Sequence, residues 1–188
     1  MRYILASKSP RRRELLGGII KEFEILTADT DEALPEGMHP RDGVRLLAER
    51  KGAAVLSAVG DDAVVISSDT LVELDGVPLG KPADEADARR MLRRLSGRTH
   101  NVHTGVAVHY RGRCFSGVDS TSVTFRELSD AEIAEYVAGG EPMDKAGAYG
   151  IQGQGGRLVA CYEGSFDTVV GLSVSLTETL IKEALSIA

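Results

Sequence analysis

Residues 5–16 have the sequence Leu-Ala-Ser-Lys-Ser-Pro-Arg-Arg-Arg-Glu-Leu-Leu, in which an apolar segment runs directly into a short basic turn. Residues 2–6 predict a β-strand. Ser9 is suited to cap a helix and Pro10 to occupy its first position, so the chain is expected to change from strand to helix within a few residues. A strand followed at once by a helix is typical of the opening of an α/β sheet.

The same turn concentrates positive charge. Lys8, Arg11, Arg12 and Arg13 crowd the predicted helix N-terminus, where acidic residues are normally preferred. A helix N-terminus presents free backbone N–H groups to anions, so an external phosphate would offset the repulsion among these cations. We therefore predict a phosphate-binding turn; the alternative is a solvated basic turn, which is what most charge runs are.

Composition limits the classes of function. The chain has 188 residues, of which 43% are hydrophobic and 27% charged, enough for one large domain or two lobes that share a core. The net charge of -6 argues against a general nucleic-acid or membrane-surface binder, because such proteins carry positive charge over much of their surface. Neither a membrane span nor the apolar core of a signal peptide is apparent. We expect a cytoplasmic protein without nucleic-acid or membrane partners, in which Cys114 and Cys161 are buried reduced thiols.

Two charged features lie in the first third of the chain. Asp29, Asp31 and Glu32 form an acidic cluster, which is either a solvated loop or a site for a divalent cation, since hard oxygen ligands suit magnesium. Apolar residues at helical spacing predict an amphipathic helix over residues 41–56. Lys51 lies beside the buried stripe of this helix, so its ammonium either reaches solvent or leans into a cleft.

A buried strand and its return carry the next candidates. The Val- and Ile-rich segment 63–68 predicts a strand covered on both faces that ends at Asp69. A carboxylate in such a place lies where open α/β sheets bind ligands, and it can hold a metal or deprotonate a water; the alternative is a cap or turn residue. The strand resumes shortly afterwards, and a hairpin turn at Asp75-Gly76 would bring Lys81 back near the carboxylate.

The rest of the chain predicts further helices and strands. The expected elements are a first helix that ends at Gly17-Gly18, a strand over 23–28, a helix over 84–95, strands over 99–110 and 114–126, a helix opened by the Ser129-x-x-Glu132 capping box, a strand over 158–162 and a helix from 172. Residues 147–156 contain too many glycines for a regular helix. Tyr149 offers this segment a flat face and Gln152 an amide, which favours a base-recognition loop over a flexible linker.

Six blocks of the sequence, in this order, resemble those of the Maf-type nucleoside triphosphate pyrophosphatases. The blocks are Leu5-Ala6-Ser7-x-Ser9-Pro10-Arg11-Arg12-x-x-Leu15-Leu16, Asp31-Glu32, Ser68-Asp69-Thr70, Gly80-Lys81-Pro82, His100-x-x-x-Thr104-Gly105-Val106 and Asp144-Lys145-Ala146-Gly147-Ala148-Tyr149-Gly150-Ile151-Gln152-Gly153. The resemblance covers essentially the whole chain. It implies a single domain over residues 1–188, with a mixed, elongated α/β sheet and flanking helices like that of the inosine triphosphate pyrophosphatases, and two lobes around a nucleotide cleft. Residues 167–173 depart from the usual family pattern.

The resemblance also implies a reaction, the hydrolysis of a nucleoside triphosphate to the monophosphate and pyrophosphate with a divalent cation, magnesium or manganese. It implies that Asp69 accepts a proton or organises the metal and that Glu32 lies near the metal. The residues that it places around the triphosphate are Ser7, Arg11, Arg12, Lys51 and Lys81. Arg12, Thr70 and Gln152 match positions that separate substrate classes, and Thr70 with Gln152 is similar to the branch that acts on dTTP and UTP in clearing the nucleotide pool.

Other functions are compatible with these residues. Within the family, the alternative is a 7-methyl-GTP pyrophosphatase. A sugar-nucleotide nucleotidyltransferase is a second alternative, although residues 6–10 lack the glycine-rich opening loop usual in those enzymes. A non-catalytic nucleotide-binding regulator of cell division is the third, although a pure binder has no need of Asp69 beside an anion. A homodimer and modified pyrimidine nucleotides as substrates also fit the resemblance.

Overall fold

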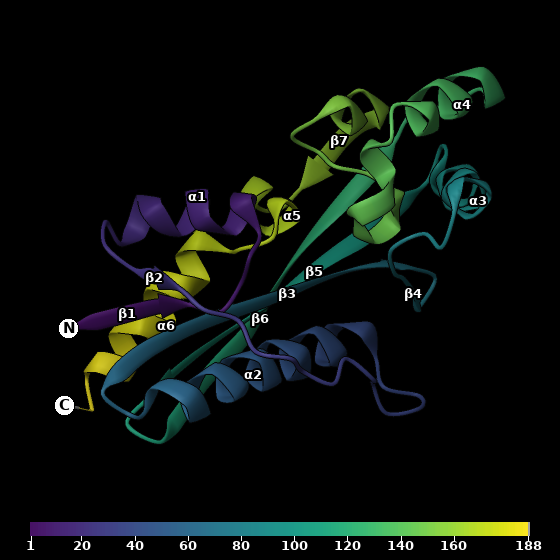
Figure 1. Ribbon diagram of the computed structural model, residues 1–188. Coiled ribbons are helices and arrows are strands. Elements are labelled where there is room, and N and C mark those ends of the chain that lie inside the picture. Colours follow the sequence, from purple (N-terminus) through teal and green to yellow (C-terminus); the bar gives the residue numbers. More distant parts are fainter. Residues whose placement is uncertain (188) are drawn as a thin grey trace. The chain divides into compact units, whose positions relative to one another are not determined.

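The computed structural model describes residues 1–187 and shows a seven-stranded mixed sheet with flanking helices (Figure 1). The strands are β1 (Arg2–Leu5), β2 (Glu24–Ile25), β3 (Ala63–Leu74), β4 (Val77–Leu79), β5 (Thr99–Tyr110), β6 (Arg113–Phe125) and β7 (Val159–Glu163). Their order is β2-β1-β3-β5-β6-β7, with β4 paired to β3. β1 runs parallel to β2 and β3, whereas β4 and β7 pair antiparallel with β3 and β6. The predicted mixed α/β class is confirmed.

The helices are α1 (Pro10–Ile19), α2 (Pro40–Val59), α3 (Glu85–Leu95), α4 (Asp130–Ala138), α5 (Phe166–Val170) and α6 (Val174–Leu185), with 3-10 turns η1 (Glu141–Asp144), η2 (Ala146–Ala148) and η3 (Gln154–Leu158). None of the helices in residues 1–187 combines the length and apolar character that crossing a membrane requires. The chain forms two compact units. The first comprises Met1–Thr70, Thr104–Asp119 and the residues from Gly171 onward, and the second comprises Leu71–His103 and Ser120–Val170. β3, β5 and β6 have residues in both units.

In the first unit, α1 and α6 cover one face of the strands and α2 covers the other (Figure 1). Leu16 of α1 and Leu180 of α6 pack in one cluster with Ile66 of β3. Val55 of α2 packs in another cluster with Val65. Neighbouring strand residues face opposite sides of a sheet, so the continuous apolar run of β3 supplies both clusters, as the strand buried on both faces was predicted to do.

Glycines at the contact allow α2 to lie very close to the sheet. A Cβ atom on Gly52 of α2 would lie 2.4 Å from Nδ1 of His109 and 2.7 Å from Oγ of Ser67. A Cβ atom on Gly105 of β5 would lie 2.4 Å from the carbonyl oxygen of Val44. Side chains larger than hydrogen at these positions would therefore push the helix away from the strands. This close packing holds Lys51, the neighbour of Gly52, beside β3.

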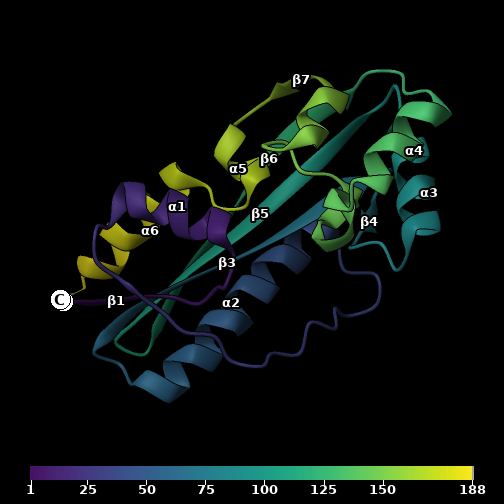
Figure 2. The same cartoon turned by 45° about the horizontal axis from the view of Figure 1, so that its top comes forward.

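In the second unit, α3 and α4 lie side by side (Figure 2). Leu92 of α3 and Ile133 of α4 are fully or almost fully buried in a cluster that includes Phe125 of β6. The Asp75-Gly76 hairpin is confirmed, and both of its residues have positive φ angles, of 55° and 77°, as the favoured two-residue turn requires. The capping box at the start of α4 is confirmed as well.

Two predicted element boundaries are wrong. α1 does not end at Gly17-Gly18 but continues to Ile19, because the Ile19 side chain packs against the apolar cluster of the first unit. The helix closes with a hydrogen bond of 2.8 Å from the backbone N–H of Ile20 to the carbonyl oxygen of Leu16. The strand expected over 23–28 is limited to Glu24–Ile25, whose side chains are exposed.

Three further expectations need correction. β3 does not end at Asp69 but runs without interruption to Leu74. The short helix α5 was not expected, and it lies in the segment where the sequence departs from the family pattern. Cys114 and Cys161 are free, as expected, but exposed. Cys114 lies at the exposed start of β6 and Cys161 among consecutive exposed residues of β7, which an apolar local sequence does not reveal.

Candidate active site

The strand-to-helix turn brings Ser7 and Arg12 together. β1 ends at Leu5, and Ser9 caps α1 because its Oγ accepts the backbone N–H of Arg12 at 3.4 Å, with Pro10 in the first turn. The Oγ of Ser7 accepts the backbone N–H of Ser9 at 3.2 Å and Nη1 of Arg12 at 3.4 Å. The predicted cap is confirmed, and it directs the Arg12 side chain back across the turn.

Arg12 is held by two further hydrogen bonds. Its Nε donates to the carbonyl oxygen of Gly171 at 2.8 Å, and its Nη2 donates to Oγ1 of Thr70 at 3.2 Å. The same carbonyl oxygen accepts Oγ of Ser68 at 2.9 Å, and Oγ1 of Thr70 lies 2.9 Å from Oγ1 of Thr104. The bonds of Arg12 use one N–H on each guanidinium nitrogen, and a guanidinium has five N–H donors. The group is therefore oriented and keeps donors for a ligand.

Charge near this guanidinium is balanced by a carboxylate. Burial lowers the pKa of Arg12, the charge of Asp69 raises it, and the charge of Arg11 lowers it again. The net shift is downward, but a guanidinium remains charged at neutral pH. Arg11 is partly buried in the first turn of α1, whereas Lys8 and Arg13 are exposed. Two members of the predicted basic cluster are therefore partly buried, and the other two are exposed.

Lys51 joins two acidic side chains. Its Nζ lies 2.5 Å from Oδ1 of Asp69 and 2.7 Å from Oε1 of Glu32. The Asp69 side chain is 12% exposed and that of Glu32 is 66% exposed. Burial lowers the pKa of Lys51, but the charges and hydrogen bonds of the two carboxylates outweigh it and raise the pKa overall. The sequence left open whether the Lys51 ammonium reaches solvent or turns inward. In the structure it is directed at Asp69.

The two groups of side chains approach β3 from opposite faces. Successive side chains alternate along a strand, so Asp69 faces Lys51 on α2 and Thr70 faces Arg12 on α1. β1 pairs with β3 only as far as Leu5, so Asp69 and Thr70 lie beyond the end of that neighbouring strand. The prediction that Asp69 ends its own strand is therefore wrong. The carboxylate lies instead just beyond the end of the parallel strand β1, which is also a place where α/β sheets bind ligands.

Glu32 and Asp69, the predicted metal ligands, share one ammonium group. In residues 1–187, no three His, Cys, Asp or Glu side chains are grouped so that they could hold a metal ion by themselves. Magnesium in nucleotide enzymes is commonly held by one or two carboxylates together with oxygens of the substrate phosphates. Two carboxylates beside a lysine and an arginine fit that mode of binding, in which the substrate completes the coordination.

Lys81 and Gln152 belong to the second unit, and both are exposed. Lys81 follows β4, and Gln152 lies between η2 and η3. The expectation that Tyr149 offers its ring to a ligand is wrong, because the side chain is buried in the core. Its hydroxyl lies 2.8 Å from Nε2 of His100, and its ring packs edge-on against that of Phe125 with 4.7 Å between centroids.

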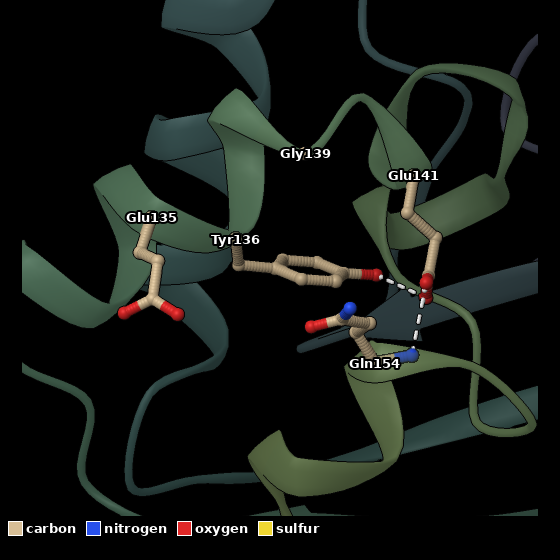
Figure 3. Close-up of a pocket in the computed structure, with 5 residues that line it drawn as sticks. All are labelled: Glu135, Tyr136, Gly139, Glu141 and Gln154. Atoms are coloured by element: carbon tan, nitrogen blue, oxygen red, sulfur yellow. Dashed lines mark hydrogen bonds between the residues drawn. The ribbon is translucent and has the colours of Figure 1, made fainter.

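The second unit also has a pocket, one of whose lining residues is only two positions from Gln152 in the sequence. The pocket has a volume of about 290 Å³, and Figure 3 shows the residues that line it, Glu135, Tyr136, Gly139, Glu141 and Gln154. The hydroxyl of Tyr136 and the backbone N–H of Gln154 both point to the carboxylate of Glu141 (Figure 3). None of these residues was a candidate from the sequence.

Ser68, Thr104 and Gly171 were not predicted as site residues. Ser68 and Thr104 lie inside blocks that were quoted for the resemblance, so a signal for them was present. Gly171 has a φ angle of 127°, and its backbone carbonyl accepts a hydrogen bond from Arg12. A pattern of side chains cannot indicate this role of the backbone.

Comparisons with known proteins show the family of the chain. A family model described as Maf-like protein matches residues 2–184. A Bacillus velezensis protein named dTTP/UTP pyrophosphatase is 50% identical over 182 residues, which cover 97% of this chain and 96% of that protein. A Hahella chejuensis protein of the same name is 48% identical over 97% of this chain and 92% of its own. The solved structure of the Staphylococcus aureus Ham1 protein matches 69% of this chain and 73% of its own at 17% identity and a TM-score of 0.49, which alone does not establish a common fold.

Proposed function

The chain belongs to the Maf family, and we propose that it hydrolyses dTTP and UTP to the nucleoside monophosphate and pyrophosphate. The observation that carries the proposal lies in the first unit. Arg12 is oriented by Ser7, Thr70 and Gly171 with N–H donors to spare, and its charge interacts with that of Asp69. An anion-binding group beside a carboxylate suits attack of water on a phosphate.

We assign the binding of the triphosphate to cationic and hydroxyl groups. Arg12 would donate its remaining N–H groups to phosphate oxygens as a planar fork, and Arg11 and Lys51 would add positive charge. Ser7 lies at the same turn, where backbone N–H groups at the start of α1 also favour an anion. Lys81, in the second unit, is assigned to the same anion from the family resemblance and from the predicted return of the chain after the Asp75-Gly76 hairpin.

Asp69 is proposed to take the proton of the attacking water. The water oxygen forms a bond to the α-phosphorus, the bond from that phosphorus to the bridging oxygen breaks, and pyrophosphate leaves with the electron pair. The water proton passes to the Asp69 carboxylate and then to solvent. Lys51 supports this role because its ammonium, 2.5 Å from Oδ1, orients the carboxylate.

Glu32 and Asp69 are the residues that would hold a divalent cation, magnesium or manganese. Such an ion would neutralise negative charge on the phosphate oxygens. When a triphosphate enters, Lys51 is the group that would move its contacts from carboxylate to phosphate oxygens, because its Nζ has three donors and already bridges two acidic partners.

Thr70 and Gln152 are proposed to select pyrimidines. The Thr70 hydroxyl is fixed between Arg12 and Thr104. Gln152 has an exposed side chain whose amide can both donate to and accept from the edge of a pyrimidine base. We further propose that residues 1–188 act as one catalytic domain, since the assigned residues come from both units, and that the protein acts on the nucleotide pool of the cytoplasm.

The test is pyrophosphate release by the purified protein, with magnesium or manganese, from dTTP, UTP, ATP, GTP, CTP and 7-methyl-GTP. We expect the highest kcat/KM with dTTP and UTP. A preference for 7-methyl-GTP would keep the reaction and overturn the assigned role of Thr70 and Gln152. No release from any nucleoside triphosphate would contradict the proposal that the protein is an enzyme.

A further inference from the structure

Gln152 lies in a glycine-rich segment with few side chains that can pack. We define this segment, residues 150–155, as the glutamine loop; Gly150, Gly153 and Gly155 make up half of it. Gln152 is exposed. Ile151 packs against the apolar cluster of the second unit, but a loop with so few packed side chains also needs restraint through its backbone, because each residue left unrestrained keeps its conformational entropy. The hydrogen bonds to the loop backbone therefore help to decide where the Gln152 amide is held.

Three of the hydrogen bonds to the loop backbone converge on one tyrosine and one carboxylate outside the loop. The backbone N–H of Gly150 donates to the hydroxyl of Tyr136 at 3.2 Å, and that hydroxyl donates to Oε1 of Glu141 at 2.9 Å. The backbone N–H groups of Gln154 and Gly155 donate to Oε2 and Oε1 of Glu141, at 2.9 Å and 3.0 Å. Both ends of the glutamine loop are thus tied to the same pair of side chains, which Figure 3 shows facing each other.

The glycines of the loop make these contacts possible. A Cβ atom on Gly153 would lie 2.5 Å from Oε2 of Glu141, and one on Gly155 would lie 2.6 Å from the hydroxyl oxygen of Tyr136. Because real Cβ atoms do not approach so closely, only glycine lets the loop backbone come this near to the pair. The glycine spacing that predicted a ligand-binding loop therefore serves, in part, contact with Glu141 and Tyr136.

The chemistry of the pair requires a carboxylate and a protonated phenol. Both oxygens of Glu141 accept hydrogen bonds, which an amide in its place cannot do. Burial raises the pKa of Glu141, but the backbone N–H groups of Gly155 and Gln154 outweigh it and lower the pKa overall. Burial and the hydrogen bond to Glu141 raise the pKa of Tyr136, so its hydroxyl keeps its proton at neutral pH.

We propose that Tyr136 and Glu141 are positioning residues that hold the glutamine loop and so set the preference for pyrimidine nucleotides. The inference rests on the proposed function, in which Gln152 contacts the base. It predicts an effect on base discrimination and KM, whereas kcat, which depends on residues of the first unit, is left nearly unchanged.

Tyr136→Phe is the most informative variant, because it removes one oxygen atom and keeps the buried ring. We expect KM for UTP and dTTP to rise about fivefold to tenfold, with kcat within about twofold of the parent, as the loss of hydrogen bonds to the loop predicts. Glu141→Gln should raise KM in the same way, because an amide cannot accept hydrogen bonds on both of its terminal atoms. Glu135→Gln is the matched control: Glu135 lines the same pocket, and it pairs only at 3.8 Å with the exposed Arg157.

A double variant separates positioning from general loss of structure. If Tyr136 acts through the loop, Tyr136→Phe in a Gln152→Ala background should change KM for UTP by less than about twofold, since the group that it positions is gone. Amide hydrogen exchange gives a readout that does not need activity. The amides of Gly150, Gln154 and Gly155 should exchange faster in Tyr136→Phe than in the parent and in Glu135→Gln.

The outcomes distinguish this inference from the proposed function. Suppose that the parent enzyme prefers dTTP and UTP and that Tyr136→Phe and Glu141→Gln leave both this preference and KM unchanged. That result would overturn the inference about the loop and leave the proposed function standing. An equal rise in KM in the parent and Gln152→Ala backgrounds would overturn it as well. A parent protein without pyrimidine preference would overturn the proposed function and with it the role given to the loop.

Discussion

Asp69 is a buried carboxylate whose Oδ1 lies 2.5 Å from the ammonium of Lys51. Asp69→Asn keeps the shape of the side chain and removes its ability to take a proton. We expect kcat for UTP to fall about 100-fold or more, the size of effect typical of general acid–base groups, with an unchanged circular dichroism spectrum. Asp62→Asn, in the exposed turn before β3, is the control. Turnover within about threefold of the parent would exclude a proton-accepting role for Asp69.

Arg12 depends on the shape of its guanidinium. Its three nitrogens donate to three different oxygen atoms, and a lysine ammonium at the end of a flexible stem cannot reproduce that pattern. Arg12→Lys should lower kcat/KM about 100-fold although the charge is kept. Arg13→Lys, one residue further along α1 and exposed, should stay within about twofold of the parent in the same steady-state assay. Equal kcat/KM in the two variants would show that charge alone is sufficient at position 12.

At the scale of the element, α2 is placed by its contact with the sheet. A Cβ atom on Gly52 would lie 2.4 Å from Nδ1 of His109, so Gly52→Ala should displace the helix and with it Lys51. We expect a loss of about 1–3 kcal/mol in the free energy of unfolding, measured with urea, together with reduced kcat. Gly18→Ala is the matched substitution, because nothing lies within 4 Å of its Cβ position in α1. That variant should be more stable by roughly 0.5–1 kcal/mol.

The core of the second unit contains a neutral histidine that should make stability depend on pH. Burial lowers the pKa of His100 from 6.5 to about 4. As the pH falls from 6.5 to 4, the unfolded state takes up the proton and the folded state does not, so the free energy of unfolding falls. The loss should reach about 3 kcal/mol at pH 4. The glutamine of His100→Gln cannot titrate but can still bond to the hydroxyl of Tyr149. Between pH 6.5 and 4, the free energy of unfolding measured with urea should therefore fall by about 3 kcal/mol less in this variant than in the parent. Parallel pH profiles for the two proteins would contradict this assignment.

Local chemistry made several elements predictable from the sequence. Ser9 with Pro10, Asp75-Gly76 and the Ser129–Glu132 capping box are signals complete within a few residues, and the structure has all three. The end of α1 was not predictable in this way, because the burial of Ile19 outweighs the weak helix propensity of two glycines. β3 continues through Asp69, whose charge is paired with the ammonium of Lys51 on α2.

At the scale of the whole molecule, the resemblance named more of the site than residue chemistry did. Ser7, Arg12 and Thr70 are in one hydrogen-bonded group in the first unit, and Glu32, Lys51 and Asp69 form a second group there. The carbonyl of Gly171 and the burial of Tyr149 depend on tertiary packing, so no pattern of residue types could have predicted them. The roles of the residues in both groups, and those of Lys81 and Gln152, remain predictions.

The central claim is that water attacks the α-phosphorus of a pyrimidine nucleoside triphosphate, and isotope labelling tests it most directly. UTP would be hydrolysed by the parent protein in water enriched in oxygen-18, and the products would be separated and analysed by mass spectrometry. We expect one labelled oxygen in UMP and none in pyrophosphate. Label in pyrophosphate would place the attack on the β-phosphorus, and labelled inorganic phosphate with UDP would place it on the γ-phosphorus; either result would contradict the account.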